Sequence, residues 1–194
     1  MRRLTLTLLT VVWSAAAHAG TDSSTDAETG LVTWQTETAG IQVRLTQISP
    51  DQARAFYLAR GFSPEAAERY TGECVFMTVV RNISDTAIQH RLADWRYEVA
   101  GQPPRAIRSK TEWEHLWKRL GVSETARIAF NWAQIPATQT YAPGDWNQGM
   151  TSYSVPRGGQ FDLHFVWRTL KGMNAGGRIH TGKLEQVRCA DEDS

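Results

Sequence analysis

The sequence predicts a mainly β protein, an antiparallel β-sandwich with a few short helices inserted in it. Stretches in which apolar and polar residues alternate recur along the chain, most cleanly at Phe161, Leu163, Phe165 and Trp167. This period of two is typical of half-buried strands. Turn sequences such as PGD at 143–145 separate the stretches. Many short strands with regular breaks favour antiparallel sheets over an α/β fold.

Residues 1–19 are expected to be an export signal. Arg2 and Arg3 precede a short apolar run, and Ala17-His18-Ala19 supplies a small-x-small cleavage pattern. The apolar run has roughly ten residues, whereas about 20 are needed to cross a bilayer. We therefore expect a cleaved signal peptide, no transmembrane segment, and a soluble mature protein that is located in the periplasm or secreted.

The remaining chain is expected to fold as one β-sandwich domain over residues 31–189, because 175 residues (194 − 19) suit a single compact domain. Residues 20–30 contain no aromatic or large aliphatic side chain, which predicts a flexible tether. The acidic tail 190–194 is predicted to be disordered for the same reason.

The predicted strands follow from apolar patterns along this domain. The run CVFMTVVRN at 74–82 is apolar on both of its faces, which predicts a central strand that is covered from two sides. The other predicted strands cover residues 41–45, 87–92, 95–99, 127–135, 138–141, 149–155, 161–167 and 178–188.

Three helices are predicted between these strands. Ser49-Pro50 and Ser63-Pro64 each place an N-cap serine before a proline at the first helical position, which predicts two short helices near residues 50–71. A third helix near 110–120 is amphipathic. Its apolar face consists of Trp113, Leu116, Trp117 and Leu120. That face is expected to pack on the sandwich, and docking of another protein is the alternative.

Three segments look like parts of the immunoglobulin-like sandwiches that are common in exported proteins. They are VVRNISDTAI at 79–88, YAPGDW at 141–146 and FDLHFVW at 161–167. The resemblance is one of pattern, without a family motif. It therefore implies an immunoglobulin-like β-sandwich and no particular activity.

Cys74 and Cys189 are the two cysteines of the chain, and export to an oxidising compartment predicts a disulfide between them. The bond would tie the final strand to a central one. It would close a long loop, which the chain-entropy model values at ~4 to 5 kcal/mol. Free thiols that act as metal ligands or redox groups are the alternative, although the sequence contains no C-x-x-C pair.

Charge and motifs exclude several functions. Removal of the two signal arginines leaves 19 basic residues (21 − 2) against 20 acidic ones, so the formal charge falls from +1 to −1. Near-neutrality with interspersed signs argues against a nucleic-acid partner. The chain contains no G-x-S-x-G elbow, H-E-x-x-H helix, P-loop or dinucleotide fingerprint. No catalytic residue is therefore predicted.

Copper is the chemical alternative, because an exported protein can bind it through imidazole and thioether ligands. If residues 81–86 close a hairpin, Met77 faces His90, which gives two ligands where a third is needed. No cofactor is assigned on this basis, and Met77 and His90 are retained only as candidate ligands.

Trp146 is the candidate for a partner-binding residue. It follows the turn at 143–145, where with Tyr141 and Tyr153 it would form an exposed aromatic platform for a sugar ring or a protein groove. Capping of the core is the alternative. Trp95, Trp132 and Trp167 lie on predicted strands and are expected to be buried.

The sequence thus predicts a non-catalytic binding or accessory protein that acts on another protein of the cell envelope. A periplasmic copper-binding or copper-delivery protein that uses His and Met ligands is the first alternative. An enzyme with an unrecognised site is the second. The identity of the partner and the oligomeric state are left open.

Overall fold

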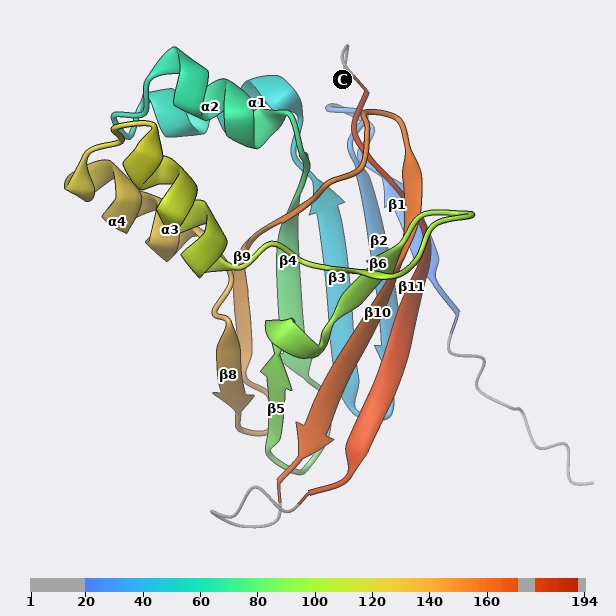
Figure 1. Cartoon of the computed structure of the whole chain (residues 1–194). Helices are drawn as coiled ribbons and strands as arrows, with labels where there is room; N and C mark the ends of the chain where they lie inside the picture. The colour runs from blue at the N-terminus through green and yellow to red at the C-terminus, as the bar shows by residue number, and fades with distance from the viewer. Residues whose placement is uncertain (1–19, 171–176, 192–194) are drawn as a thin grey trace, which may run out of the picture.

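The computed structural model describes residues 20–170 and 177–191. The predicted signal peptide, residues 1–19, and residues 192–194 of the predicted tail lie outside the described residues. Within the described ranges the protein is mainly β, with two antiparallel sheets and four short α-helices. The helices gather beside one end of the sheets (Figure 1). The predicted mainly β, antiparallel class is therefore confirmed.

The first sheet has the strand order β1-β2-β3-β4-β9, and all its pairs are antiparallel. The strands are β1 (Asp22–Thr25), β2 (Val32–Thr38), β3 (Ile41–Gln47), β4 (Cys74–Asn82) and β9 (Trp146–Tyr153). Ala39 and Gly40 join β2 to β3 with φ angles of 42° and 86°, as a two-residue type I′ turn requires. Phe76 of β4 lies in the core between the sheets and Val75 faces the helices, so the prediction of a strand covered from two sides is confirmed.

The second sheet is built on the long strand β10. Its strands are β7 (Arg105–Ala106), β6 (Arg96–Glu98), β10 (Gln160–Thr169), β5 (Ile88–Arg91) and β8 (Thr138–Tyr141), with β11 (Ile179–Arg188) on the other edge of β10. The 3-10 helix η1 (Leu92–Asp94) joins β5 to β6. Every second side chain of β10 is buried from Phe161 to Trp167, which confirms the predicted alternation.

Side chains from both sheets form one core between them. Trp95, Phe165 and Trp167 are fully buried there, with neighbouring ring centroids 5.6 to 5.7 Å apart. The indole N–H of Trp95 donates to the carbonyl of Val166 at 3.0 Å, so burial leaves this donor paired. The predicted burial of Trp95 and Trp167 is confirmed.

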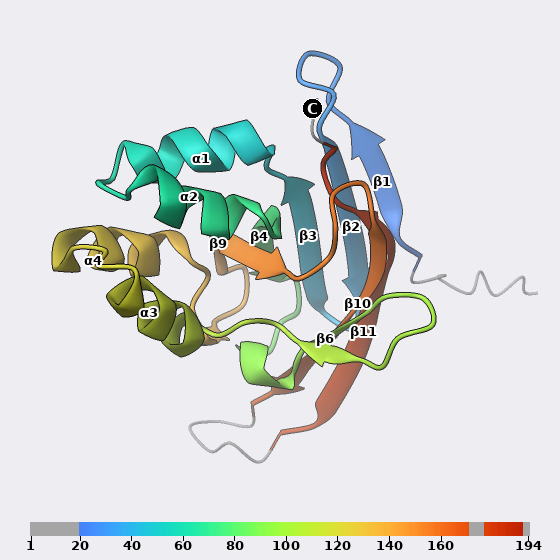
Figure 2. The ribbon, with the colours of Figure 1, turned by 45° about the horizontal axis from the view of Figure 1, so that its top comes forward.

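The helices lie beside β4 and β9 and form a second core against the outer face of the first sheet (Figure 2). They are α1 (Pro50–Leu58), α2 (Pro64–Thr71), α3 (Lys110–Arg119) and α4 (Glu124–Ala133). Ser49, Ser63 and Ser109 cap α1, α2 and α3 by accepting backbone N–H groups of the first turn. The predicted helices near 50–71 and 110–120 are therefore confirmed.

The apolar face of α3 packs inside the molecule. Trp113 contacts Tyr70 of α2 with ring centroids 5.1 Å apart, and Trp117 contacts Phe130 of α4 at 5.3 Å. These partners belong to helices, and the same core also includes Val75 of β4 and Met150 of β9. Intramolecular packing is confirmed, and the docking alternative for this face is wrong.

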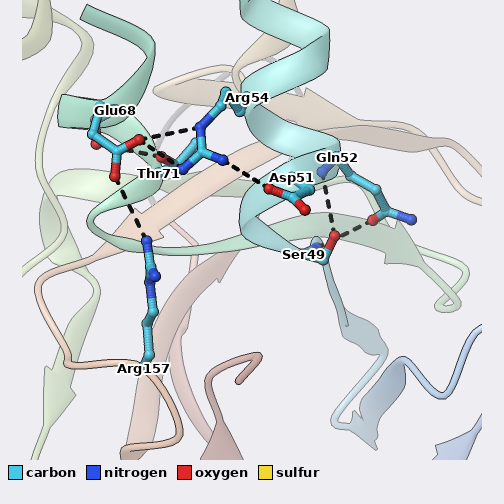
Figure 3. A network of polar contacts seen from close by, with 7 residues as sticks. All are labelled: Ser49, Asp51, Gln52, Arg54, Glu68, Thr71 and Arg157. Carbon is cyan, nitrogen blue, oxygen red and sulfur yellow. Dashed lines mark hydrogen bonds and ion pairs between the residues drawn. The ribbon is translucent and has the colours of Figure 1, made fainter. Parts of the chain in front are cut away.

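A surface network of charged side chains joins α1 to α2 (Figure 3). Arg54 pairs with Asp51 at 2.8 Å and with Glu68 at 2.7 Å. The Oε1 atom of Glu68 also lies 3.8 Å from an Nη atom of Arg157, which is in the loop after β9. Solvent screens exposed pairs of this kind, so they contribute little to stability.

Residues 127–135, which the sequence analysis assigns to a strand, lie mostly in helix α4. Apolar residues do alternate there, but Ala126 and Phe130 also stand at i and i+4 and form the buried face of a helix. Ser123 caps this helix by accepting the N–H of Ala126. Trp132 lies on the opposite face and is 86% exposed, so the strand and the predicted burial of Trp132 are both wrong.

Residues 20–30, predicted as a flexible tether, contain strand β1 and its turn. β1 pairs with β2 along its whole length, although all of its side chains are exposed. Asp26 holds the turn by accepting the N–H groups of Glu28 and Thr29. An edge strand is held by backbone hydrogen bonds and needs no apolar side chains, so a polar composition does not exclude it.

Cys74 and Cys189 form the predicted disulfide, which spans 115 positions. It joins the first residue of β4 to the residue that follows β11. The N–H of Cys189 donates to the carbonyl of Gly159, and the carbonyl of Ala190 accepts from Gly158. The chain is therefore anchored through residue 190, the first residue of the segment predicted as a disordered tail.

Candidate functional site

The predicted aromatic platform around Trp146 does not form. Trp146 begins β9 and is 57% exposed, but Tyr141 and Tyr153 are buried. Both tyrosines point into the core between the sheets, where Tyr153 packs on Phe161 with ring centroids 4.5 Å apart. Tyr141 and Tyr153 are therefore corrected to core residues, and Trp146 is left as an isolated surface aromatic.

Met77 and His90 lie in different sheets. The predicted hairpin over 81–86 does not form, because β4 pairs with β3 and β9 whereas β5 pairs with β10 and β8. Met77 packs against the helical core, and His90 packs on the rings of Trp95 and Tyr141. The proposed copper pair is therefore not brought together. Among the described residues no group of three His, Cys, Asp or Glu side chains is placed to hold a metal ion.

His90 is expected to make the protein less stable in mild acid. The residue is 1% exposed, and its Nε2 lies 3.0 Å from the carbonyl oxygen of Pro136. Burial lowers the pKa of His90 below its ordinary value, because the charged ring would lose its hydration. Below about pH 6.5 the unfolded state then binds more protons than the folded state. Stability therefore falls as the pH drops from about 6.5 toward the lowered pKa.

The free energy of unfolding in urea, measured between pH 7.5 and pH 5, tests this expectation. The variant His90→Gln keeps an amide donor for Pro136 and removes the titrating ring. The wild-type slope should exceed that of the variant by up to about 1.4 kcal/mol per pH unit. His115→Gln, which removes an exposed histidine, is the matched control. Identical slopes in the wild type and His90→Gln would contradict the assignment.

A cavity of about 180 Å³ lies where α3 and α4 meet β9 and the segment around η1. Its apolar wall is formed by Leu92, Ile107, Trp113, Ile135 and Met150. Its polar groups come from Lys110, Gln134, Thr151 and Ser152, with Arg91 and Arg108 beside them. An apolar wall with a few converging polar groups is typical of a small-molecule site.

Gly149 lets the backbone of residues 134–135 pack closely against β9 and form part of the cavity wall. After α4 the chain runs beside β9, where the N–H of Ile135 donates to the carbonyl of Met150 at 3.2 Å. A Cβ atom on Gly149 would overlap the backbone of Gln134 and Ile135. A glycine within a strand often marks such a close approach of a second backbone, and here it places Gln134 and Ile135 beside the cavity.

Lys110 is the central charge of the lining. Its Nζ donates to the carbonyls of Asn131 at 2.8 Å and Gln134 at 3.1 Å, at the C-terminal end of α4. An ammonium group has three donors, so one remains for a ligand. Partial burial lowers the pKa of Lys110 by desolvation. The two carbonyls nevertheless stabilise the protonated form, as does the negative end of the helix dipole.

Ser152 supplies an unpaired hydroxyl. It is 2% exposed, and its Oγ has no hydrogen-bond partner within the described part of the chain. On β9 it shares a face with Met150, the face that is turned toward the helices. A buried hydroxyl without a partner costs about 1 to 3 kcal/mol. A polar ligand atom in the cavity would remove this cost.

The charges around the cavity are unevenly balanced. The part of its lining that the structure describes contains no aspartate or glutamate. Arg91 pairs with Asp94 at 3.7 Å and Arg108 pairs with Glu73 at 2.8 Å. Lys110 has carbonyl partners but no ion pair with a described carboxylate. The lining therefore carries a positive charge that an anionic ligand would balance.

The cavity is not visible in local sequence patterns, because its wall comes from separate segments of the chain. Residues 91–93, 107–113, 134–138 and 150–152 contribute to it, and these segments meet only in the folded chain. One sequence signal does point to part of the wall: Ser123-Glu124 after Gly121 is typical of the start of a helix. This helix is α4, and Gln134 follows its last residue.

The outer face of α4 carries a second feature, which was not among the predicted site residues. Ile128 and Trp132, at i and i+4, are both exposed and lie side by side on this face. Exposed apolar side chains that cluster in this way are typical of interaction surfaces. We refer to Ile128 and Trp132 as the outer α4 face.

No family model, curated protein or solved structure matches the chain. The fold and the site define the protein as a mainly β chain of two antiparallel sheets, with a helical layer and a cavity where that layer meets the strands. In the ranges 20–170 and 177–191 no helix is long and apolar enough to cross a membrane.

Proposed function

We propose that this chain is an exported, non-catalytic binding protein that holds a small ligand in the cavity beneath α3 and serves as an accessory to another protein of the cell envelope. The cavity carries the proposal, because the buried Ser152 hydroxyl lacks a partner and Lys110 lacks a balancing carboxylate. Buried polar groups are nearly always satisfied in folded proteins. A bound anionic ligand would give the hydroxyl a partner and would balance the charge of Lys110.

The chemistry of the lining favours binding over catalysis. The Lys110 ammonium donates to two backbone carbonyls, and a protonated amine is not a nucleophile. Ser152 has no histidine or carboxylate beside it among the described lining residues, so a general base that would activate its hydroxyl is not in place. What the lining offers a ligand is hydrogen bonds, one charge and apolar contact.

The location and the partner are part of the same proposal. The disulfide supports export, because such bonds persist in oxidising compartments. We place the protein in the periplasm, or outside the cell, after cleavage of residues 1–19. The outer α4 face and Trp146 are the proposed contact points for the partner protein. We also propose that the two sheets form an immunoglobulin-like sandwich, and this proposal is based on the strand and turn patterns of the sequence alone.

The proposal is tested by purifying the native mature protein from its own compartment, followed by mass spectrometry of the small molecules and proteins that remain bound. Ile107→Phe places a bulkier ring in the cavity wall and obstructs the cavity, and Ile179→Phe adds the same volume at an exposed position. We expect about one equivalent of a small molecule on the wild type and on Ile179→Phe, its loss from Ile107→Phe, and a stoichiometric envelope protein. A wild type that carries neither molecule nor partner would refute the proposal.

A further inference from the structure

We infer that the ligand of the cavity beneath α3 is a small monocarboxylate with an apolar body about the size of one aromatic ring, held through its carboxylate by Lys110 and Ser152. This inference rests on the proposed function and names the chemical class of its ligand.

The volume of the cavity limits the ligand to a small molecule. An apolar protein cavity of about 150 Å³ takes up benzene, so a volume of about 180 Å³ admits one ring and a small head group. The wall formed by Ile107, Ile135 and Met150 is apolar. Burial of an apolar body against these side chains is favourable because it removes apolar surface from water.

The charge of the lining determines the head group. Arg91 and Arg108 are each paired with an acid, so Lys110 is the one lining cation for which the described chain supplies no carboxylate. A carboxylate would accept the third N–H of Lys110 in a charge-assisted hydrogen bond. A single unbalanced charge suits one carboxylate, whereas a cationic ligand would be repelled.

The Ser152 hydroxyl adds a second, independent contact. It is buried, it lines the cavity and its Oγ has no partner among the described residues. The hydroxyl can donate to a carboxylate oxygen, and a hydrogen bond to an ionised acceptor is stronger than one to a neutral group. Two donors among the lining residues, the Lys110 ammonium and the Ser152 hydroxyl, favour an acid over a hydrocarbon.

The inference is tested with the full chain by calorimetric titration with three probes of similar shape: benzoate, benzamide and benzylamine. Lys110→Gln removes the charge and keeps amide donors for the carbonyls that Lys110 now binds. Lys118→Gln removes an equal charge from an exposed position of the same helix and is the matched control. Ser152→Ala removes the hydroxyl alone. Circular dichroism establishes that each variant is folded.

We expect the wild type and Lys118→Gln to bind benzoate at least about tenfold more tightly than benzamide, with benzylamine weakest. In Lys110→Gln this preference should fall to about twofold or less, and Ser152→Ala should weaken benzoate binding about threefold or more. Equal or tighter binding of benzamide by the wild type would overturn the carboxylate assignment and leave the cavity as a binding site. If none of the probes binds and Ile107→Phe matches the wild type in native purification, the proposed function fails as well.

A peptide that ends in a phenylalanine carboxylate distinguishes a free acid from the C-terminus of a polypeptide, since both present a carboxylate next to an apolar group. We expect this peptide to bind more weakly than benzoate, because the cavity has room for one ring and its head group. Tighter binding of the peptide would overturn the assignment to a free small acid.

Discussion

Replacement of Trp117 by alanine is expected to lower the free energy of unfolding by about 3 to 5 kcal/mol. Trp117 is fully buried, and its ring stacks on Trp113 with centroids 4.8 Å apart. It also packs edge-on against Phe62 at 5.2 Å and Phe130 at 5.3 Å. Helices of eight to ten residues are marginal on their own, so the helical layer depends on this aromatic core.

Urea denaturation followed by circular dichroism measures this loss without relying on tryptophan fluorescence. Trp132→Ala is the matched control, because it removes the same side chain from an exposed position of the adjacent helix α4. We expect its effect to stay within about 0.5 kcal/mol. Similar losses in the two variants would contradict the separation of these tryptophans into a core residue and a surface residue.

The sequence predicts an element correctly where its local pattern agrees with its buried environment. The predicted strands at 41–45, 74–82, 87–92, 95–99, 138–141, 149–155, 161–167 and 178–188 each overlap an observed strand. Residues 127–135 fail because the same apolar residues fit both a period of two and a helical face. There the aromatic core of the other helices favours the helix, and this tertiary contact is not visible in a short window.

Pairing between distant segments is the part of the fold that local patterns do not carry. The predicted hairpin over 81–86 does not form, because the chain passes here from β4 in the first sheet to β5 in the second sheet. The buried Asn82 side chain stabilises this crossing by donating to the carbonyls of Thr86 and Tyr141. Because β4 and β5 belong to different sheets, Met77 and His90 are not brought together, and the predicted copper pair does not form. The cavity depends on another long-range contact of this kind, the approach of Ile135 to Gly149.

The disulfide could be predicted because it needs little structural knowledge. Two cysteines in one chain have a single possible intramolecular pairing, and this pairing is present. The predicted aromatic platform was only partly predictable. The position of Trp146 after a turn correctly indicates that it is exposed, whereas the burial of Tyr141 and Tyr153 depends on which face of each strand turns inward. The candidate site is therefore less predictable than the fold, because its residues come from segments that are far apart in the sequence.

Removal of the disulfide is expected to lower the free energy of unfolding by about 2 to 5 kcal/mol. The closed loop spans 115 positions, which places the expected effect in the upper part of that range, because a longer loop restricts the unfolded chain more. Both sulfur atoms belong to buried residues. The double variant Cys74→Ala and Cys189→Ala therefore leaves two small apolar side chains and no unpaired polar group.

Urea denaturation of the wild type and the double variant, each with and without a reductant, separates the bond from the side chains. The reductant should destabilise the wild type to about the level of the double variant and leave the double variant unchanged. Because Cys189 is also held by the backbone of Gly159, the end of β11 should keep part of its protection from hydrogen exchange in the folded double variant. A wild type that is insensitive to full reduction would show that the bond does not stabilise the fold, since the crosslink acts mainly by restricting the unfolded chain.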